Sequence, residues 1–229
     1  MNTIGLIGGL SWQSSIDYYR LINEDVQRRL GGHHNARSMM VSVDFAEAEA
    51  MMSAGDWDGL RRLLVDAGRR VEAAGADFAL LCTNTMHKLA GPLQDALGNP
   101  LLNIVDAAAG AVRDAGLSRV ALLGTRFVMS EDFYVQRLAD GGVQALVPDA
   151  AGQAEVDRII FEELTRGRIT ASSRQAYLSV IDRLQEQGAQ GVILGCTEIG
   201  LLLKQDDCTL PLFDTTAIHA RTAVDRALG

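Results

Sequence analysis

The feature that most constrains this chain is an internal repeat. The segment GADFALLCTNT, which begins at Gly75, matches GAQGVILGCTEI, which begins at Gly188. The opening TIGLIGGLS has a weaker counterpart in RVALLGTRF, so that Gly8 aligns with Gly124. A repeat on this scale indicates that one structural unit occurs twice along the chain. The sequence therefore predicts two similar lobes.

The spacing between the repeated anchors supports this interpretation. Gly8 precedes Thr83 by 75 residues, and Gly124 precedes Cys196 by 72. Each half then ends in a strand-like run followed by an acidic helix start, NIVDAA in the first half and LFDTTA in the second. Three anchors in the same order and at similar spacing are hard to obtain by chance in one chain.

Apolar runs of strand length alternate with longer segments of helical period. The expected strands are Thr3–Gly8, Met39–Val43, Phe78–Cys82, Leu101–Val105, Val120–Gly124, Ala145–Val147, Val192–Cys196 and Leu210–Phe213. The expected helices are Tyr18–Leu30, Leu60–Ala74, Ala107–Ala115, Glu155–Thr165, Arg174–Gln187 and Ile218–Leu228. Nearly continuous hydrophobicity is typical of parallel strands that are covered on both faces. The pattern predicts an α/β fold of two pseudo-symmetric lobes, each a mostly parallel sheet flanked by helices.

The repeat also predicts where the lobes divide and where a ligand binds. Residues 1–112 together with 211–229 are expected to form the first lobe, and residues 113–210 the second. In open parallel sheets, ligands bind beyond the carboxyl ends of the strands, where loops lead to helix N-termini. The repeated Gly, Thr, Asn and Cys residues fall at such strand ends. We therefore expect the active site in a cleft between the two lobes.

Composition excludes several classes of function. Apolar residues make up 48% of the 229-residue chain and charged residues 22%, which excludes wholesale disorder. The net charge of −8 argues against a nucleic-acid partner, whose binding surface would be basic. No apolar stretch approaches the roughly 18–20 residues that cross a bilayer, and the N-terminus lacks the basic lead-in of a signal peptide. Three cysteines are too few for a disulfide scaffold, so we expect a cytoplasmic protein with no membrane partner.

Cys196 is a candidate nucleophile or proton-transfer group. It follows the apolar run GVILG and precedes Thr197 and Glu198. A thiol at the start of a helix ionises more easily, because the helix dipole and the free N–H groups favour the thiolate. A small apolar cysteine that ends a buried strand is an equally common alternative.

The repeat partner of Cys196 is Thr83, counted from the shared Gly-Ala of each segment. Cys82 lies one residue earlier, and strand alternation would turn it to the other face unless a local bulge intervenes. Asn84 and Thr85, which follow, offer donors for a carboxylate at the next helix start.

Several other polar residues near strand ends allow two interpretations each. The turn GLIGGLSWQSS lacks the spacing of a dinucleotide fingerprint, and it suits either a small anion or a plain turn. Thr125, beside Gly124, has the same two interpretations. His87 and His219 follow strand ends, where each is either a partner for a thiol or carboxylate or a histidine of the core. No cluster of ligands has metal spacing.

The segments GLIGGLSW, C-x-N-T-M-H at Cys82 and GCTEI at Cys196 together resemble the aspartate/glutamate racemase family, and most closely its broad-specificity amino-acid racemase branch. The resemblance covers essentially the whole chain. It implies two α/β lobes around a cleft, no pyridoxal phosphate, no metal and often a homodimer. It also implies inversion of the α-carbon of a free amino acid, aspartate and glutamate included, by two cysteines, one from each lobe, although here Thr83 occupies the place of the first-lobe cysteine, directly before Asn-Thr.

Carried onto this chain, the resemblance implies Thr83 and Cys196 as the catalytic pair, with Cys196 acting on the L-enantiomer. Cys82 remains an alternative first-lobe acid or base, because a threonine hydroxyl is a poor base at neutral pH. The residues expected to bind substrate are Leu10, Ser11, Asn84, Thr85, Thr125, Thr197 and Glu198.

The chain departs from members that act on acidic amino acids. Those members usually carry a lysine at the place that Thr165 occupies here, and a basic residue after the second strand, where SVDFAEAEA has none. Arg166 or Arg168 remain as candidates to bind a side-chain carboxylate. We expect broader or different substrates.

Two other classes of function remain open at this point. One is a cis–trans isomerase or decarboxylase of small dicarboxylates, which uses cysteines at the same positions. The other is an amino-acid-binding protein that has lost its chemistry through Thr83.

Overall fold

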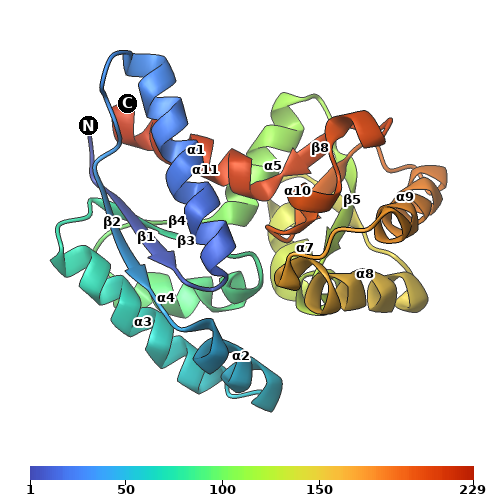
Figure 1. The fold of residues 1–229 in the computed structure, drawn as a ribbon, viewed down its shortest axis with the longest axis horizontal. Coiled ribbons are helices and arrows are strands. Elements are labelled where there is room, and N and C mark those ends of the chain that lie inside the picture. Colours follow the sequence, from blue (N-terminus) through green and yellow to red (C-terminus); the bar gives the residue numbers. More distant parts are fainter. The chain divides into compact units, whose positions relative to one another are not determined.

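A computed structural model describes residues 1–229 in full. The chain forms two compact units, Met1–Ile104 with His219–Gly229 and Val105–Ile218, and each contains its own sheet (Figure 1). None of the helices combines the length and the apolar character that a membrane span requires.

Both sheets have four parallel strands in the same order. The first sheet, ordered β2-β1-β3-β4, comprises β1 (Ile4–Gly8), β2 (Ser38–Ser42), β3 (Phe78–Leu81) and β4 (Leu101–Leu102). The second, ordered β6-β5-β7-β8, comprises β5 (Arg119–Gly124), β6 (Gln144–Leu146), β7 (Val192–Gly195) and β8 (Leu212–Asp214). The predicted α/β fold of two duplicated, parallel-sheet lobes is therefore confirmed.

In the first unit, helices on both faces of the sheet bury its central strands, β1 and β3. Its helical elements are α1 (Trp12–Leu30), α2 (Phe45–Ala54), α3 (Trp57–Ala73), the 3₁₀ turn η1 (Thr85–Leu89), α4 (Ala90–Ala96) and the last part of α11 (Thr215–Leu228). Leu6 and Leu80 pack with Tyr18 of α1 and Val224 of α11 in one core cluster. Helix α3 covers the opposite face so closely that a Cβ at Gly5 would lie 2.3 Å from a Val71 methyl. The glycine thus permits the close approach of helix and strand.

The second unit repeats this arrangement with its own helices. They are α5 (Ile104–Asp114), α6 (Arg126–Ser130), α7 (Asp132–Asp140), α8 (Ala150–Glu162), η2 (Leu164–Arg166), α9 (Ala171–Glu186), α10 (Ile199–Leu202) and η3 (Gln205–Asp207). Leu123 and Leu194 pack with Ile159 of α8 and Tyr177 of α9. Strand β8 pairs with β7 and so lies in the second sheet, whereas the boundary expected at residue 211 places it with the first lobe.

Helix boundaries differ more from the expectation than strands do. Helix α1 begins at Trp12, six residues before the expected start at Tyr18, because the Ser11 hydroxyl accepts the Ser14 N–H and caps it. Helix α2 was not expected, although Asp44 caps it in the same way. Short helices with weak apolar periodicity owe their stability to tertiary packing, which the sequence pattern does not report.

Candidate functional site

The repeated residues lie at the carboxyl ends of the two central strands. In the second sheet, Gly124 pairs with the last residue of β7, which immediately precedes Cys196. In the first sheet, the equivalent glycine, Gly8, falls opposite Cys82, one step beyond the last pair of β1 and β3. Thr83 therefore takes the place in the first sheet that Cys196 takes in the second. Strand register thus gives the same equivalence as the repeat in the sequence.

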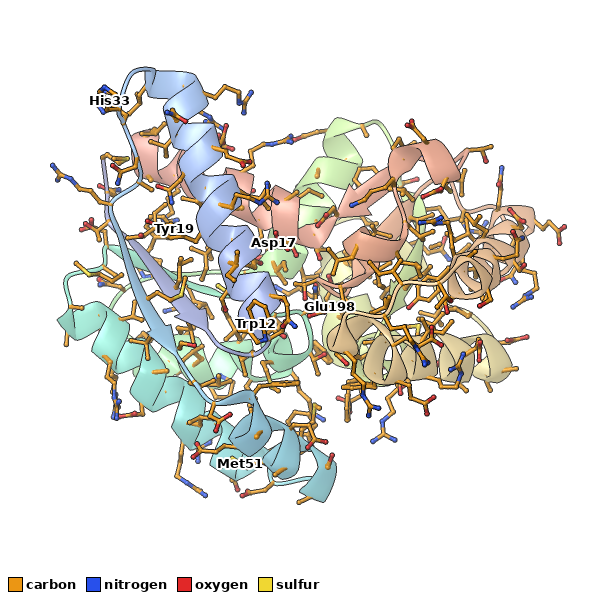
Figure 2. All side chains as sticks on the ribbon, viewed as in Figure 1. Trp12, Asp17, Tyr19, His33, Met51 and Glu198 are labelled. Atoms are coloured by element: carbon orange, nitrogen blue, oxygen red, sulfur yellow. The ribbon has the colours of Figure 1, made fainter.

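Cys196 is hydrogen-bonded to an acidic side chain. Its Sγ lies 3.0 Å from Oε2 of Glu198, and the Thr197 hydroxyl donates to the same oxygen at 2.6 Å. Glu198, labelled in Figure 2, is the N-cap residue that directly precedes α10. Both Cys196 and Glu198 are buried. One carboxylate oxygen therefore receives two donors at the strand end, and the sulfur is one of them.

The pKa of the Cys196 thiol is raised well above its ordinary value, first by burial and then by the negative charge and hydrogen bond of Glu198. The expectation that a helix start would favour the thiolate is wrong here. Helix α10 has four residues, so its dipole is small beside the burial and the adjacent carboxylate. Cys196 is consequently a thiol at neutral pH, with a carboxylate placed to accept its proton.

Cys82 and Thr83 have different surroundings. Cys82 is buried in the core cluster with Tyr18 and Leu80, and burial raises the pKa of its thiol. Thr83 is half-buried, its backbone N–H is bonded to Leu81, and its hydroxyl makes no hydrogen bond to the protein. These surroundings favour Thr83 over Cys82 as the group that meets a substrate.

The remaining expected binding residues lie at the same strand ends of their own units. Asn84 and Thr85 are buried at the start of η1, directly after Thr83. Thr125 is buried at the start of α6, directly after β5. Thr197 is half-buried, and its hydroxyl orients Glu198.

The glycine-rich turn after β1 is held by its own side chains. Leu10 and Ser11 are buried in it, and Ser11 has a φ of 154°, which L residues rarely adopt. The glycine turn was expected to suit either a small anion or a plain turn. Its Gly9 N–H donates to the Ser15 hydroxyl at 2.8 Å. The Ser15 hydroxyl in turn donates to the Ser11 carbonyl at 3.2 Å. Sequence patterns alone did not single out Ser15, although its hydroxyl closes the turn.

Gly9→Ala is expected to destabilise the protein by about 2 kcal/mol or more, because Gly9 has a φ of +83° and a new Cβ would lie 2.1 Å from the Val43 carbonyl oxygen. Gly91→Ala is the matched control, since a Cβ there meets no atom within 4 Å and the site is helical. Urea denaturation of both variants measures the difference. Equal midpoints for the two variants would contradict the close packing of this turn.

The two histidines belong to a buried network in the first unit. His219 is fully buried, and burial, followed by the nearby His87, lowers its pKa to about 3. It is a neutral histidine of the core, so the structural alternative is the correct one for this residue. The His87 ring contacts the backbone of Thr83.

The arginines considered for a side-chain carboxylate have other surroundings. Arg168 lies 3.6 Å from the buried carboxylate of Glu163, and Arg166 is exposed. The Thr165 hydroxyl donates to the Phe161 carbonyl at 3.0 Å. No group of three or more His, Cys, Asp or Glu side chains is arranged to hold a metal ion.

Comparison with known proteins identifies the family. The family model described as Asp/Glu/hydantoin racemase matches residues 7–223. The chain belongs to this family. The resemblance carried by the repeated motifs is therefore confirmed.

Solved structures and a curated relative agree with this family assignment. A candidate Asp/Glu racemase of Yersinia pestis is 47% identical, with a TM-score of 0.94 over 100% of both chains. An aspartate racemase homologue of Pyrococcus horikoshii is 32% identical, with a TM-score of 0.88 over 100% of both chains. The broad-specificity amino-acid racemase RacX of Bacillus subtilis is 24% identical over 173 residues, which cover 76% of this chain and 74% of RacX.

Proposed function

We propose that this protein is a cofactor-independent racemase that inverts the α-carbon of free amino acids, with Cys196 and Thr83 as its two proton-transfer groups. The observation that carries the proposal is the 3.0 Å contact between the Cys196 sulfur and the Glu198 carboxylate. In a member of the Asp/Glu/hydantoin racemase family, this contact lies at one of two equivalent strand ends, and Thr83 lies at the other.

The proposed reaction moves one proton off the α-carbon and one proton on. The Cys196 thiol passes its proton to Glu198, and the thiolate removes the α-proton to form a new S–H bond. The electron pair left on the α-carbon is delocalised into the substrate carboxylate. Thr83 donates its hydroxyl proton to the opposite face of the carbon, and water reprotonates the threonine oxygen while Glu198 returns its proton to solvent.

The raised pKa of Cys196 serves this reaction. An α-proton is only weakly acidic, so the base that removes it must itself be strong. A thiolate with a raised pKa is a stronger base than an ordinary thiolate, and Glu198 provides a route for forming it. In this proposal Cys196 is a protonated thiol at rest, and the strongly basic thiolate forms only during turnover.

The carbanion requires hydrogen-bond donors around the substrate carboxylate, because no cofactor acts as an electron sink. We assign this role to Asn84, Thr85 and Thr125, which are buried at the strand ends of their units, and we assign substrate contacts also to Leu10 and Ser11 in the turn after β1. The hydroxyl of Thr197 is engaged by Glu198, so we assign it to the positioning of that carboxylate.

The proposed substrate class rests on two positions that the family resemblance singles out. Thr165 replaces a lysine common among members for acidic amino acids, and Arg168 pairs with Glu163. We therefore propose that the enzyme accepts neutral amino acids as well as aspartate and glutamate.

Incubation with single L-amino acids in D₂O tests the function. A racemase incorporates deuterium at the α-carbon and produces the D-enantiomer, which NMR and chiral chromatography measure separately. A dicarboxylate isomerase or decarboxylase, or a binding protein without chemistry, would leave the α-proton of every amino acid in place. That outcome across the common L- and D-amino acids would overturn the proposal.

Thr83→Ala is expected to lower the rate of inversion by about 10²-fold or more, because it removes one of the two proton-transfer groups. Cys82→Ala is expected to stay within about threefold of the parent rate, because Cys82 packs in the core of the first unit. Circular dichroism confirms the fold of each variant. A large loss of inversion in Cys82→Ala with Thr83→Ala unaffected would transfer the first-unit role to Cys82.

The family resemblance also leads us to propose a homodimer that works in the cytoplasm. Light scattering coupled to size-exclusion chromatography measures the mass directly, and a mass of one chain at micromolar concentration would refute the dimer.

A further inference from the structure

His87 lies in the turn that follows Thr83 and bonds the backbone on both sides of its ring. Its Nδ1 is 2.7 Å from the Thr83 carbonyl oxygen, and the Ile104 backbone N–H donates to its Nε2 at 3.1 Å. A backbone N–H can only donate, so Nε2 is an acceptor and the ring proton is on Nδ1. His87 is therefore the neutral tautomer that donates to Thr83.

A second histidine holds His87 in place. The His219 ring packs edge-on against the His87 ring, with centroids 6.0 Å apart. The Nε2–H of His219 donates a hydrogen bond to the Leu102 carbonyl at 3.0 Å, and the Tyr18 hydroxyl donates to Nδ1 at 2.8 Å. Both nitrogens of this buried ring are satisfied, and its lowered pKa of about 3 keeps it neutral. Helices α1 and α11 and strand β4 thus fix the position of His87.

The Thr83 carbonyl accepts no hydrogen bond except that of His87. Thr83 lies outside the regular ladder of β3, in a tight turn closed by its own N–H to the Leu81 carbonyl at 2.8 Å. The backbone at Thr83 fixes the Cα–Cβ bond and restricts the χ1 rotamers of this β-branched side chain, whose hydroxyl has no protein partner of its own.

We infer that His87 is a positioning residue for Thr83. Its hydrogen bond fixes the Thr83 carbonyl and so directs the Thr83 hydroxyl to the substrate, while the buried His219, bonded to Tyr18, keeps the His87 ring in place. The inference rests on the proposed function of Thr83. A displacement of about 1 Å at a proton-transfer group costs a large factor in rate, so a fixed carbonyl at this turn matters for inversion. His87 itself does not exchange protons in this role.

The test compares His87→Leu with His87→Asn in the full-length protein. Leucine removes both ring contacts, while the asparagine amide nitrogen stands close to the place of Nδ1 and can still donate to the Thr83 carbonyl. Each variant is given an L-amino acid in D₂O, and deuterium incorporation and inversion are measured on the same sample. Leu93→Ala is the matched control for lost stability, because Leu93 is buried in α4 and its side chain makes none of the hydrogen bonds of the His87 ring.

His87→Leu is expected to lower inversion by about 30-fold or more at unchanged KM, because Thr83 is no longer aimed. Deuterium exchange with retention is expected to persist, since Cys196 and Glu198 can remove and return the hydrogen on their own face. The ratio of exchange to inversion should therefore rise, and His87→Asn should restore most of the inversion. Leu93→Ala should change both rates by the same factor.

A fall of exchange and inversion by equal factors in His87→Leu, or no recovery in His87→Asn, would overturn the positioning role. Failure of the proposed function is distinguishable from this result, because the parent protein would then exchange no α-proton at all.

Discussion

Replacement of Cys196 by serine is expected to reduce α-proton exchange and inversion by at least about 10³-fold, equivalent to roughly 4 kcal/mol of transition-state stabilisation. A serine hydroxyl is a much weaker acid than a thiol, so Glu198 would not generate its anion at neutral pH. The change is nearly isosteric, so the fold is expected to survive. Chiral chromatography and NMR in D₂O measure the two rates.

Cys208→Ser is the matched control for Cys196→Ser. Cys208 follows η3 and is half-buried, and it packs against the core cluster of the second unit, which contains Cys196. Its variant is expected to keep the parent rates. Near-full activity in Cys196→Ser, with the fold intact by circular dichroism, would refute the proposed mechanism.

Glu198→Gln is expected to produce two changes of opposite sign. Inversion should fall by about 10²-fold, because the group that accepts the thiol proton is lost. Alkylation of Cys196 by iodoacetamide should become faster at pH 8, because the Glu198 charge and hydrogen bond raise the pKa of the thiol in the parent protein. Removing that charge lowers the thiol pKa and increases the thiolate fraction at a given pH.

The pH dependence of alkylation shows directly whether Glu198 raises or lowers the pKa of the Cys196 thiol. In the parent protein, the alkylation of Cys196 should rise only at a pH above that at which an ordinary cysteine ionises, and in Glu198→Gln the rise should move to lower pH. Glu186→Gln, an exposed change of the same charge at the end of α9, is the control and should alter neither rate. A slower alkylation in Glu198→Gln would show that Glu198 stabilises the thiolate instead.

The strand predictions, which rest on local runs of apolar residues, were confirmed. All eight strands appear within a few residues of their expected positions, because continuous apolar runs such as Val192–Cys196 are suited to burial on both faces. The helix starts were less accurate. Helix α1 begins at Trp12 because Ser11 caps it. The short helices α2 and α10 are stabilised by tertiary packing, which a hydrophobic period in the sequence does not predict.

The protonation states of Cys196, His87 and His219 depend on burial and on tertiary contacts, which the sequence alone does not predict. The motif Cys-Thr-Glu contains the partners of Cys196, but spacing alone does not say that Glu198 turns back to within 3.0 Å of the sulfur. Burial and that carboxylate reverse the expected direction of the thiol pKa. Similarly, the tautomer of His87 follows from the Ile104 N–H, 17 residues along the chain, and the lowered pKa of His219 follows first from its burial and then from the nearby His87.

The sequence by itself determined the duplication, the parallel α/β class, the family and the pairing of Thr83 with Cys196, because repeats and apolar periodicity are recorded residue by residue. Only the tertiary structure decided that Cys82 faces a core, that Cys196 rests as a thiol beside Glu198, and that a neutral His87, packed against His219, is hydrogen-bonded to the Thr83 carbonyl. Those properties arise from desolvation and from hydrogen bonds between distant segments, which exist only after the chain has folded.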